Sequence, residues 1–257
     1  MMQLIESTKE MFRDSRFLRK ALMIACPVAL QGMLNTVVNL VDTLMIGTMG
    51  ATAIAAVGLA NKFFFVFSLL VFGIVSGSGV LAAQFWGNGD LRSIRKVLGL
   101  SILLALTGAL FFVVPALVSP QSVMRIFTTS HDSVELGSKY LKIAVLTYPF
   151  LAMTNVYVAI LRAVNKVIFP VISSCIAIVI NICLNYVLIF GKLGMPAMGV
   201  SGAAVATLIA RIIEIVLILG YVYGKRLPVA CGLKDLFWLE QTVCQPVFRH
   251  VSPCHCQ

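Results

Sequence analysis

Long segments without a charged residue are the feature that most limits how this chain can fold. Five of them lack Asp, Glu, Lys and Arg altogether, and they cover residues 21–41, 63–89, 97–118, 143–161 and 167–191. A sixth segment, residues 193–223, contains only Arg211 and Glu214. Because a helix needs roughly 20 apolar residues to cross about 30 Å of hydrocarbon, each segment is long enough to span a membrane. The sequence therefore predicts six membrane-spanning helices joined by short loops.

The overall composition excludes a soluble domain. Of the 257 residues, 60% are hydrophobic and only 12% are charged, against roughly 45–50% and about 25% in soluble proteins. Too few charged side chains remain to cover the surface of a globular core, so lipid has to cover the rest. After Asp42, the residues Gly47, Gly50 and Thr52 predict a turn, with the next helix starting near Ala53. We therefore expect an all-α integral membrane protein, a six-helix bundle.

The net charge of +10 follows from the predicted topology. If both ends of the six-helix unit lie in the cytoplasm, thirteen basic residues fall on the cytoplasmic side and four on the other side. Such an imbalance is what the positive-inside rule describes. We therefore expect a multi-pass protein of the plasma or inner membrane with both termini cytoplasmic. The charge does not indicate a nucleic-acid partner.

The chain divides into three predicted parts. Residues 1–16 mix acids with bases and carry no cleavable signal peptide, and we expect an amphipathic segment on the inner membrane surface or a frayed terminus. Residues 17–224 form the six-helix unit, and residues 225–257 form a cytoplasmic tail.

Polar side chains on the first predicted helix form one stripe. Gln31, Asn35, Asn39 and Asp42 follow one another at spacings of four, four and three residues, so they share a helical face. Ionisable groups at membrane depth are costly, by about 2.5–3.5 kcal/mol on insertion scales, which makes Asp42 a functional candidate. Pro27 lies on the same face and can kink the helix. The alternative is that the stripe only holds helices together.

The fifth and sixth predicted helices carry matching polar faces. Ser174, Asn181 and Asn185 share one face of the fifth helix, and Thr207, Arg211 and Glu214 share one face of the sixth. Arg211 and Glu214 are spaced to form an ion pair, which lowers the cost of burying them. A carboxylate, two amides and a hydroxyl suit a hard monovalent cation or a proton. Lys62 lies near the start of its apolar segment and is expected to snorkel toward an interface.

No catalytic chemistry is evident in the sequence. It lacks HExxH, GxxxxGK[ST] and a paired-carboxylate motif, and it has no set of Ser, His and Asp at membrane depth. We expect no enzyme and no metal site beyond a possible Na⁺ site.

Five segments resemble one family in their sequence and in their order. They are PVALQGMLNTVVNLVDTLMIGTMG at 27–50, GSGVLAAQFWGNGD at 77–90, YLKIAVLTYPFLAMTNVYVAILRAVNK at 140–166, NICLNYVLIFG at 181–191 and MGVSGAAVATLIAR at 198–211. They resemble the multidrug and toxic compound extrusion (MATE) transporters, and the resemblance extends over residues 15–238.

This resemblance implies a fold and a function. Family members have two six-helix lobes around a cavity that opens alternately inward and outward, and they export cationic or amphipathic compounds in exchange for Na⁺ or H⁺. By resemblance, Asp42 is the cation-coupling acid of the first lobe, and Asn181, Asn185 and Thr207 join its site in a NorM-like arrangement. Gln31, Asn35, Asn39, Arg211 and Glu214 are candidates for lining the cavity. No cofactor is implied other than the coupling ion.

The chain departs from the family in its length. Family members are close to twice as long, so only the N-terminal lobe is expected here, with a homodimer partner or a separate second lobe completing the cavity. The resemblance ends after Trp238, and we expect residues 239–257 to be non-native sequence from out-of-frame coding of a truncated gene product. Two other functions stay open: a non-transporting membrane fragment or scaffold, and a flippase for lipid-linked precursors from the same superfamily.

Overall fold

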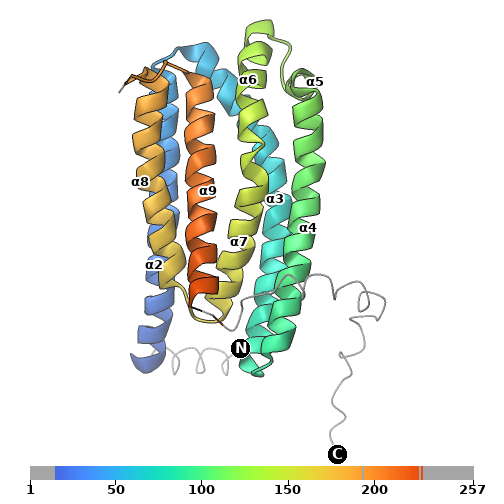
Figure 1. Ribbon diagram of the computed structural model, residues 1–257, viewed down its shortest axis with the longest axis vertical. Helices are drawn as coiled ribbons and strands as arrows, with labels where there is room; N and C mark the ends of the chain where they lie inside the picture. The colour runs from blue at the N-terminus through green and yellow to red at the C-terminus, as the bar shows by residue number, and fades with distance from the viewer. Residues whose placement is uncertain (1–14, 193, 226, 228–257) are drawn as a thin grey trace, which may run out of the picture.

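The computed structural model describes residues 15–192, 194–225 and 227, and every regular element within them is a helix. The helices are α2 (Ser15–Gly47), α3 (Ala51–Gly87), α4 (Leu91–Val118), α5 (Pro120–Arg125), α6 (His131–Ala144), α7 (Thr147–Ala163), α8 (Ile168–Phe190) and α9 (Val200–Gly224). They form one elongated bundle, with α2, α8 and α9 on one side, α4 and α5 on the other, and α6 and α7 between them (Figure 1).

The bundle contains enough long apolar helices for the predicted membrane fold. Helices α3, α4, α8 and α9 and the Ala25–Gly47 part of α2 are each long and apolar enough to cross a bilayer. Helices α6 and α7 are long and apolar enough when taken together, as one span bent by 47°. The start of α2 and the end of α9 lie at the same end of the bundle (Figure 1). The prediction of an all-α, multi-span membrane protein is therefore confirmed.

Two predicted helices differ most from their expected bounds. The sixth begins at Val200 and not at residue 193, because Gly199 adopts a backbone conformation with φ 59° and ψ −131° that ends the preceding turn. The span predicted over residues 143–161 is the pair α6 and α7, of which α6 begins twelve residues earlier, at His131. Helix α6 carries four charged side chains, so it lies outside the charge-free segments of the sequence. Helix α5 was likewise not predicted.

The first turn agrees with its prediction. Helix α2 ends at Gly47, the chain turns through Gly50 with φ 108°, and α3 begins at Ala51. Pro27 lies within α2, which the structure assigns as one helix from Ser15 to Gly47. Most of the predicted segments 1–16 and 225–257 lie outside the described residues, so the expectations for both, including the non-native tail from about residue 239, stay predictions.

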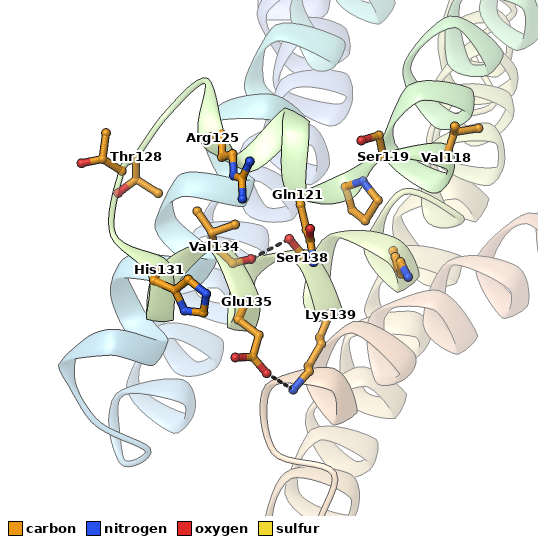
Figure 2. A pocket seen from close by; sticks show the side chains of 13 residues that line it. Val118, Ser119, Gln121, Arg125, Thr128, His131, Val134, Glu135, Ser138 and Lys139 are labelled. Atoms are coloured by element: carbon orange, nitrogen blue, oxygen red, sulfur yellow. Dashed lines mark hydrogen bonds and ion pairs between the residues drawn. The ribbon is translucent and has the colours of Figure 1, made fainter.

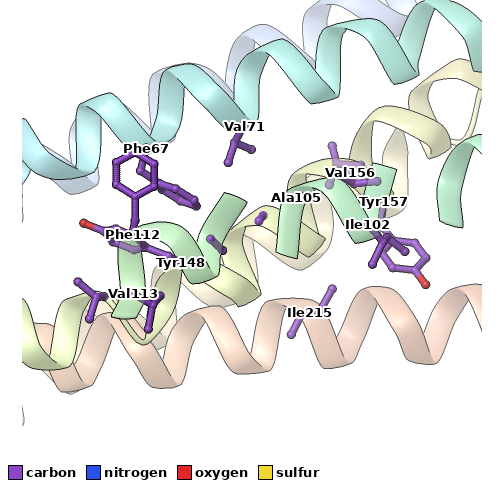
Figure 3. Packing of buried hydrophobic residues seen from close by; sticks show 14 of the residues in the cluster. Phe67, Val71, Ile102, Ala105, Phe112, Val113, Tyr148, Val156, Tyr157 and Ile215 are labelled. Atoms are coloured by element: carbon purple, nitrogen blue, oxygen red, sulfur yellow. The ribbon is translucent and has the colours of Figure 1, made fainter. Parts of the chain in front are cut away.

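The main hydrophobic core lies where α3, α4, α7 and α9 meet. The ring of Phe67 on α3 stacks on that of Tyr148 on α7, with centroids 4.4 Å apart, and Phe112 on α4 meets Phe67 edge-on at 5.6 Å (Figure 3). In the middle of the cluster, Ala105 on α4 is fully buried, and such small residues let helices approach closely within a membrane (Figure 3). This core fixes the helices against which the polar faces are set.

Helix α2 attaches to the bundle along one narrow stripe. Its buried residues, among those the structure describes, are Gln31, Val38 and Ile46, spaced seven and eight residues apart, and it packs mainly against α8. The other faces of α2 are exposed and apolar, with Leu30, Met33, Val37, Leu40 and Leu44. The stripe that faces α8 is the one that carries the predicted polar residues.

Candidate cation site

Asp42 lies on the buried stripe of α2 and meets an amide on α8. The Nδ2 atom of Asn185 donates a hydrogen bond of 2.6 Å to Oδ1 of Asp42. Asp42 is half-buried, whereas Asn185 is 0% exposed. A charge-assisted bond of this kind stabilises an ionised carboxylate that has left bulk water.

The hydrogen bonds continue from α8 to α9. Nδ2 of Asn185 also approaches Oδ1 of Asn181, one turn earlier on α8, at 3.2 Å. Nδ2 of Asn181 in turn donates to Oγ1 of Thr207 on α9 at 3.3 Å, and that hydroxyl donates to the carbonyl oxygen of Ala203 at 3.0 Å. Asp42, Asn185, Asn181 and Thr207 therefore form one hydrogen-bonded series across three helices.

The series leaves an oxygen acceptor without a partner. Oδ1 of Asn185 is buried and accepts no hydrogen bond from any described residue. Buried polar atoms are nearly always paired, because an unpaired one loses its hydration without compensation. Amide and carboxylate oxygens are also the ligand type that hard cations prefer. The arrangement is therefore chemically suited to a small cation beside Asp42.

Two cavities meet at Asp42. One, of about 150 Å³, is lined by the polar faces of α2, α8 and α9, including Asn35, Asn39, Asp42, Asn181, Thr207, Arg211 and Glu214. The other, of about 380 Å³, shares Asp42, Thr207 and Arg211 with the first and extends to aromatic side chains of α3, α6 and α7. Asp42 therefore lies between a small polar cavity and a larger, more aromatic one.

A second series of hydrogen bonds lies farther from the α2–α3 turn. Oγ of Ser174 accepts a bond of 2.7 Å from Nε2 of Gln31 and donates one of 2.6 Å to Oε1 of Glu214. Oε2 of Glu214 pairs with Nη1 of Arg211 at 2.7 Å. At the other end, Nη2 of Arg162 on α7 donates to Oε1 of Gln31 at 2.9 Å. This series ties α2, α7, α8 and α9 together.

The structure brings most of the predicted residues to one place. Asp42, Asn181 and Thr207 line the small cavity, as do four of the five cavity-lining candidates, Asn35, Asn39, Arg211 and Glu214. Two residues are placed differently. Asn185 lies behind Asp42 and lines neither cavity, and Gln31 belongs to the hydrogen bonds with Ser174 and Arg162 and not to a cavity wall.

The sequence did not identify Arg162 or the aromatic wall. Arg162 lies in the last turn of α7, and in the sequence it counts only as one of the basic residues expected on the cytoplasmic side. Phe64, Tyr140 and Tyr148 line the larger cavity, but aromatic residues are common everywhere in apolar helices. The spacing of these residues in the sequence therefore does not indicate that they line a site.

Another cavity, of about 910 Å³, lies elsewhere, where α4, α5 and α6 meet. Its wall holds Arg125, His131 and an exposed ion pair between Glu135 and Lys139 at 2.8 Å (Figure 2). This hollow is open at the end of the bundle and includes none of the residues around Asp42. Within the described part of the chain, no group of three His, Cys, Asp or Glu side chains could hold a metal ion.

Comparison with known proteins gives consistent matches. A family model described as MatE matches residues 27–187. A probable multidrug resistance protein NorM from Thermotoga maritima is 32% identical over 212 residues, which are 81% of this chain and 45% of that protein. The multidrug resistance protein MdtK from Pectobacterium atrosepticum is 31% identical over 221 residues, 85% of this chain and 47% of that protein.

The fold has close structural counterparts as well. A solved structure described as an outward-facing multidrug resistance MATE family transporter of the MOP superfamily matches with a TM-score of 0.76 and 25% identity, covering 84% of this chain and 48% of that chain. The chain thus spans about half the length of the relatives it matches.

Proposed function

Because this chain belongs to the MatE family, we propose that it forms one lobe of a membrane antiporter that exchanges a cation, Na⁺ or H⁺, for an amphipathic or cationic compound. The cation binds at Asp42, and the exported compound occupies the larger cavity beside it. The relatives are named multidrug resistance proteins, which supports export of small molecules as the activity.

The observation that carries this proposal is the surroundings of Asp42. A carboxylate at membrane depth costs free energy, so it usually has a polar partner and a function. Here it is bonded to Asn185, next to an unpartnered buried oxygen, and it lines both cavities. An ion bound at Asp42 therefore lies next to the cavity that takes the exported compound, so the occupation of one position can act on the other.

Coupling follows from the weak attachment of α2. The apolar contacts of α2 with the bundle are few, and Asp42, through Asn185, supplies one of the two polar attachments of α2 to α8 that the described residues make. A cation that neutralises Asp42 weakens the attraction of this carboxylate for Nδ2 of Asn185. Helix α2 then shifts along α8, and the shape of the cavity next to Asp42 changes.

A second lobe closes the transport cavity. One six-helix lobe leaves the apolar faces of α2 and α3 exposed, including Leu40, Leu44, Phe65 and Phe72. In a bilayer, lipid or a second lobe covers such a face. We propose that the second lobe comes from another chain or from a second copy of this one, and that both ends of the six-helix unit face the cytoplasm.

Gradient-driven transport tests the proposal. The chain is reconstituted in liposomes, and a Na⁺ gradient or a pH gradient is imposed separately on vesicles that contain ethidium or Nε-dansyl-lysine. At least one gradient should drive movement of a probe, and Asp42→Asn should abolish the dependence on the gradient. Asp90→Asn, which removes a carboxylate outside the membrane spans, serves as the control. Gradient-driven movement that persists in Asp42→Asn would refute the role of Asp42.

A further inference from the structure

Arg211 is held on one edge and open on the other. Its Nη1 atom pairs with Oε2 of Glu214 at 2.7 Å, and Oε1 of Glu214 is in turn held by Ser174. Glu214 is 2% exposed, whereas the side chain of Arg211 is 33% exposed and lines both cavities. Within the described residues, Arg211 makes no other hydrogen bond.

The open edge of Arg211 has a defined chemistry. A guanidinium presents five N–H donors in a planar fork and accepts no hydrogen bond. Such a fork binds carboxylate and phosphate groups with two parallel hydrogen bonds. Because Glu214 and Ser174 fix one edge, the rest of the fork is pre-organised toward the cavities and loses little freedom when an anion binds.

The charges in the larger cavity point to the same ligand. Among the described residues that line it, Asp42 is the one acidic side chain and Arg211 the one basic side chain, so together they are neutral while Asp42 is ionised. In the exchange proposed above, on which this step rests, the compound is taken up while Asp42 holds no coupling cation, so the wall then presents one negative and one positive group. A compound with both an ammonium and a carboxylate is complementary to both groups, whereas a purely cationic compound leaves Arg211 without an anion.

We propose that Arg211 binds an anionic group of the exported compound, so that the larger cavity takes aromatic compounds carrying a carboxylate in preference to purely cationic ones. The aromatic body packs against Phe64, Phe65 and Tyr140, and the carboxylate lies on the open edge of Arg211. A carboxylate on the open edge shares the charge of Arg211 with Glu214 and so weakens their ion pair, and Glu214 connects through Ser174 to Gln31 on α2. Substrate binding at Arg211 therefore acts on α2, as the coupling ion does at Asp42.

A matched pair of fluorescent probes tests this preference. Nε-dansyl-lysine carries an aromatic group, an ammonium and a carboxylate, and its methyl ester lacks only the carboxylate. Binding of each to the chain in nanodiscs is followed by dansyl fluorescence, with empty nanodiscs giving the background. The dissociation constant of the acid should be at least about tenfold lower than that of the ester, as expected for a charge-assisted hydrogen bond. Equal binding of acid and ester, or no binding of the acid, would overturn the proposal.

Variants separate the role of Arg211 from a structural one. Arg211→Gln alone leaves the buried Glu214 unpaired and risks misfolding, so Arg211→Gln is combined with Glu214→Gln, which removes both charges. The double variant should bind acid and ester equally, whereas Glu214→Gln alone and Arg211→Lys should keep a preference for the acid. A preference for the acid that survives in the double variant contradicts the proposal. Gradient-driven movement of ethidium is read separately, so antiport can hold while the role of Arg211 fails.

Discussion

Asn185 donates a hydrogen bond of 2.6 Å to Asp42, while its own Oδ1 is buried without a partner among the described residues. The pair joins α2 to α8 at the point where two cavities meet. It combines a structural attachment with a free oxygen, which is the combination that a cation-responsive contact requires.

Replacing Asn185 tests the attachment. Asn185→Leu removes the donor to Asp42, and the loss of a hydrogen bond to a charged group costs about 1.5–3 kcal/mol. We expect a lower midpoint of thermal unfolding in detergent and loss of any stabilisation by added Na⁺. The control is Tyr186→Leu on the next residue, which is 53% exposed. Equal losses in both variants would show that the amide makes no special contribution.

Close packing of α8 and α9 depends on Gly202. A Cβ atom at this position would lie 2.7 Å from the carbonyl oxygen of Leu188, whereas one at Gly220 would meet nothing within 4 Å. Gly202→Ala should therefore destabilise the protein by about 1–3 kcal/mol, as overpacking does. Gly220→Ala in the same helix should be neutral or stabilising, because alanine favours helix. Thermal unfolding of the two variants tests this prediction. An unfolding midpoint of Gly202→Ala equal to that of the wild type would contradict the packing described.

Gln31 provides the second polar attachment of α2. Gln31→Leu leaves Ser174 and Arg162 without their α2 partner. We expect amide hydrogen exchange across α2 to accelerate by up to about tenfold, since the lost bonds resist local opening. Met33→Leu, on the exposed side of α2 at 68%, should leave exchange unchanged. Identical exchange in the two variants would mean that Gln31 does not hold the helix.

Asp90 caps the start of α4, outside the membrane spans. The hydroxyl of Ser93 donates to its carboxylate, as does the backbone N–H of Ser93 at 3.1 Å, and these bonds lower the pKa of Asp90 below its usual value. A lowered pKa means that the capping contribution is present above the pKa of the unfolded chain and is lost as the pH falls through the folded pKa.

Asp90→Ala should therefore unfold at a lower temperature than the wild type at neutral pH. This difference in unfolding temperature should become smaller in acid. Thermal unfolding at a series of pH values measures it, with Asn88→Ala just before the cap as the control. A gap that stays constant into the acid range would show that the charged form of Asp90 adds nothing to the cap.

The membrane fold and the polar faces could be predicted because they follow from local rules. Span length follows from the thickness of the bilayer, and a helical period places Asn35, Asn39 and Asp42 on one face wherever the helix lies. A polar face is unfavourable against lipid, so the polar face of α2 is expected to pack against another polar face. Asn181 and Thr207 lie on the faces available for this contact. Their proximity in the structure follows from these constraints.

Contacts that depend on how helices are rotated against one another could not be predicted. Gln31 lies on the same predicted face as Asp42, yet it bonds to Ser174 and Arg162, because α7 and α8 bring those side chains to that depth. Helix α6 could not be predicted from uncharged segments, because it carries four charged side chains. The aromatic wall of the larger cavity is set by tertiary packing, which the spacing of apolar residues does not encode.

Difference infrared spectroscopy of the carboxyl groups tests most directly whether a cation binds at Asp42. Raising the pH or adding Na⁺ to the reconstituted wild type should change a carboxyl band. That change should be absent in Asp42→Asn and retained in Asp90→Asn. The same band change in Asp42→Asn, or no cation-dependent change in the wild type, would contradict the account.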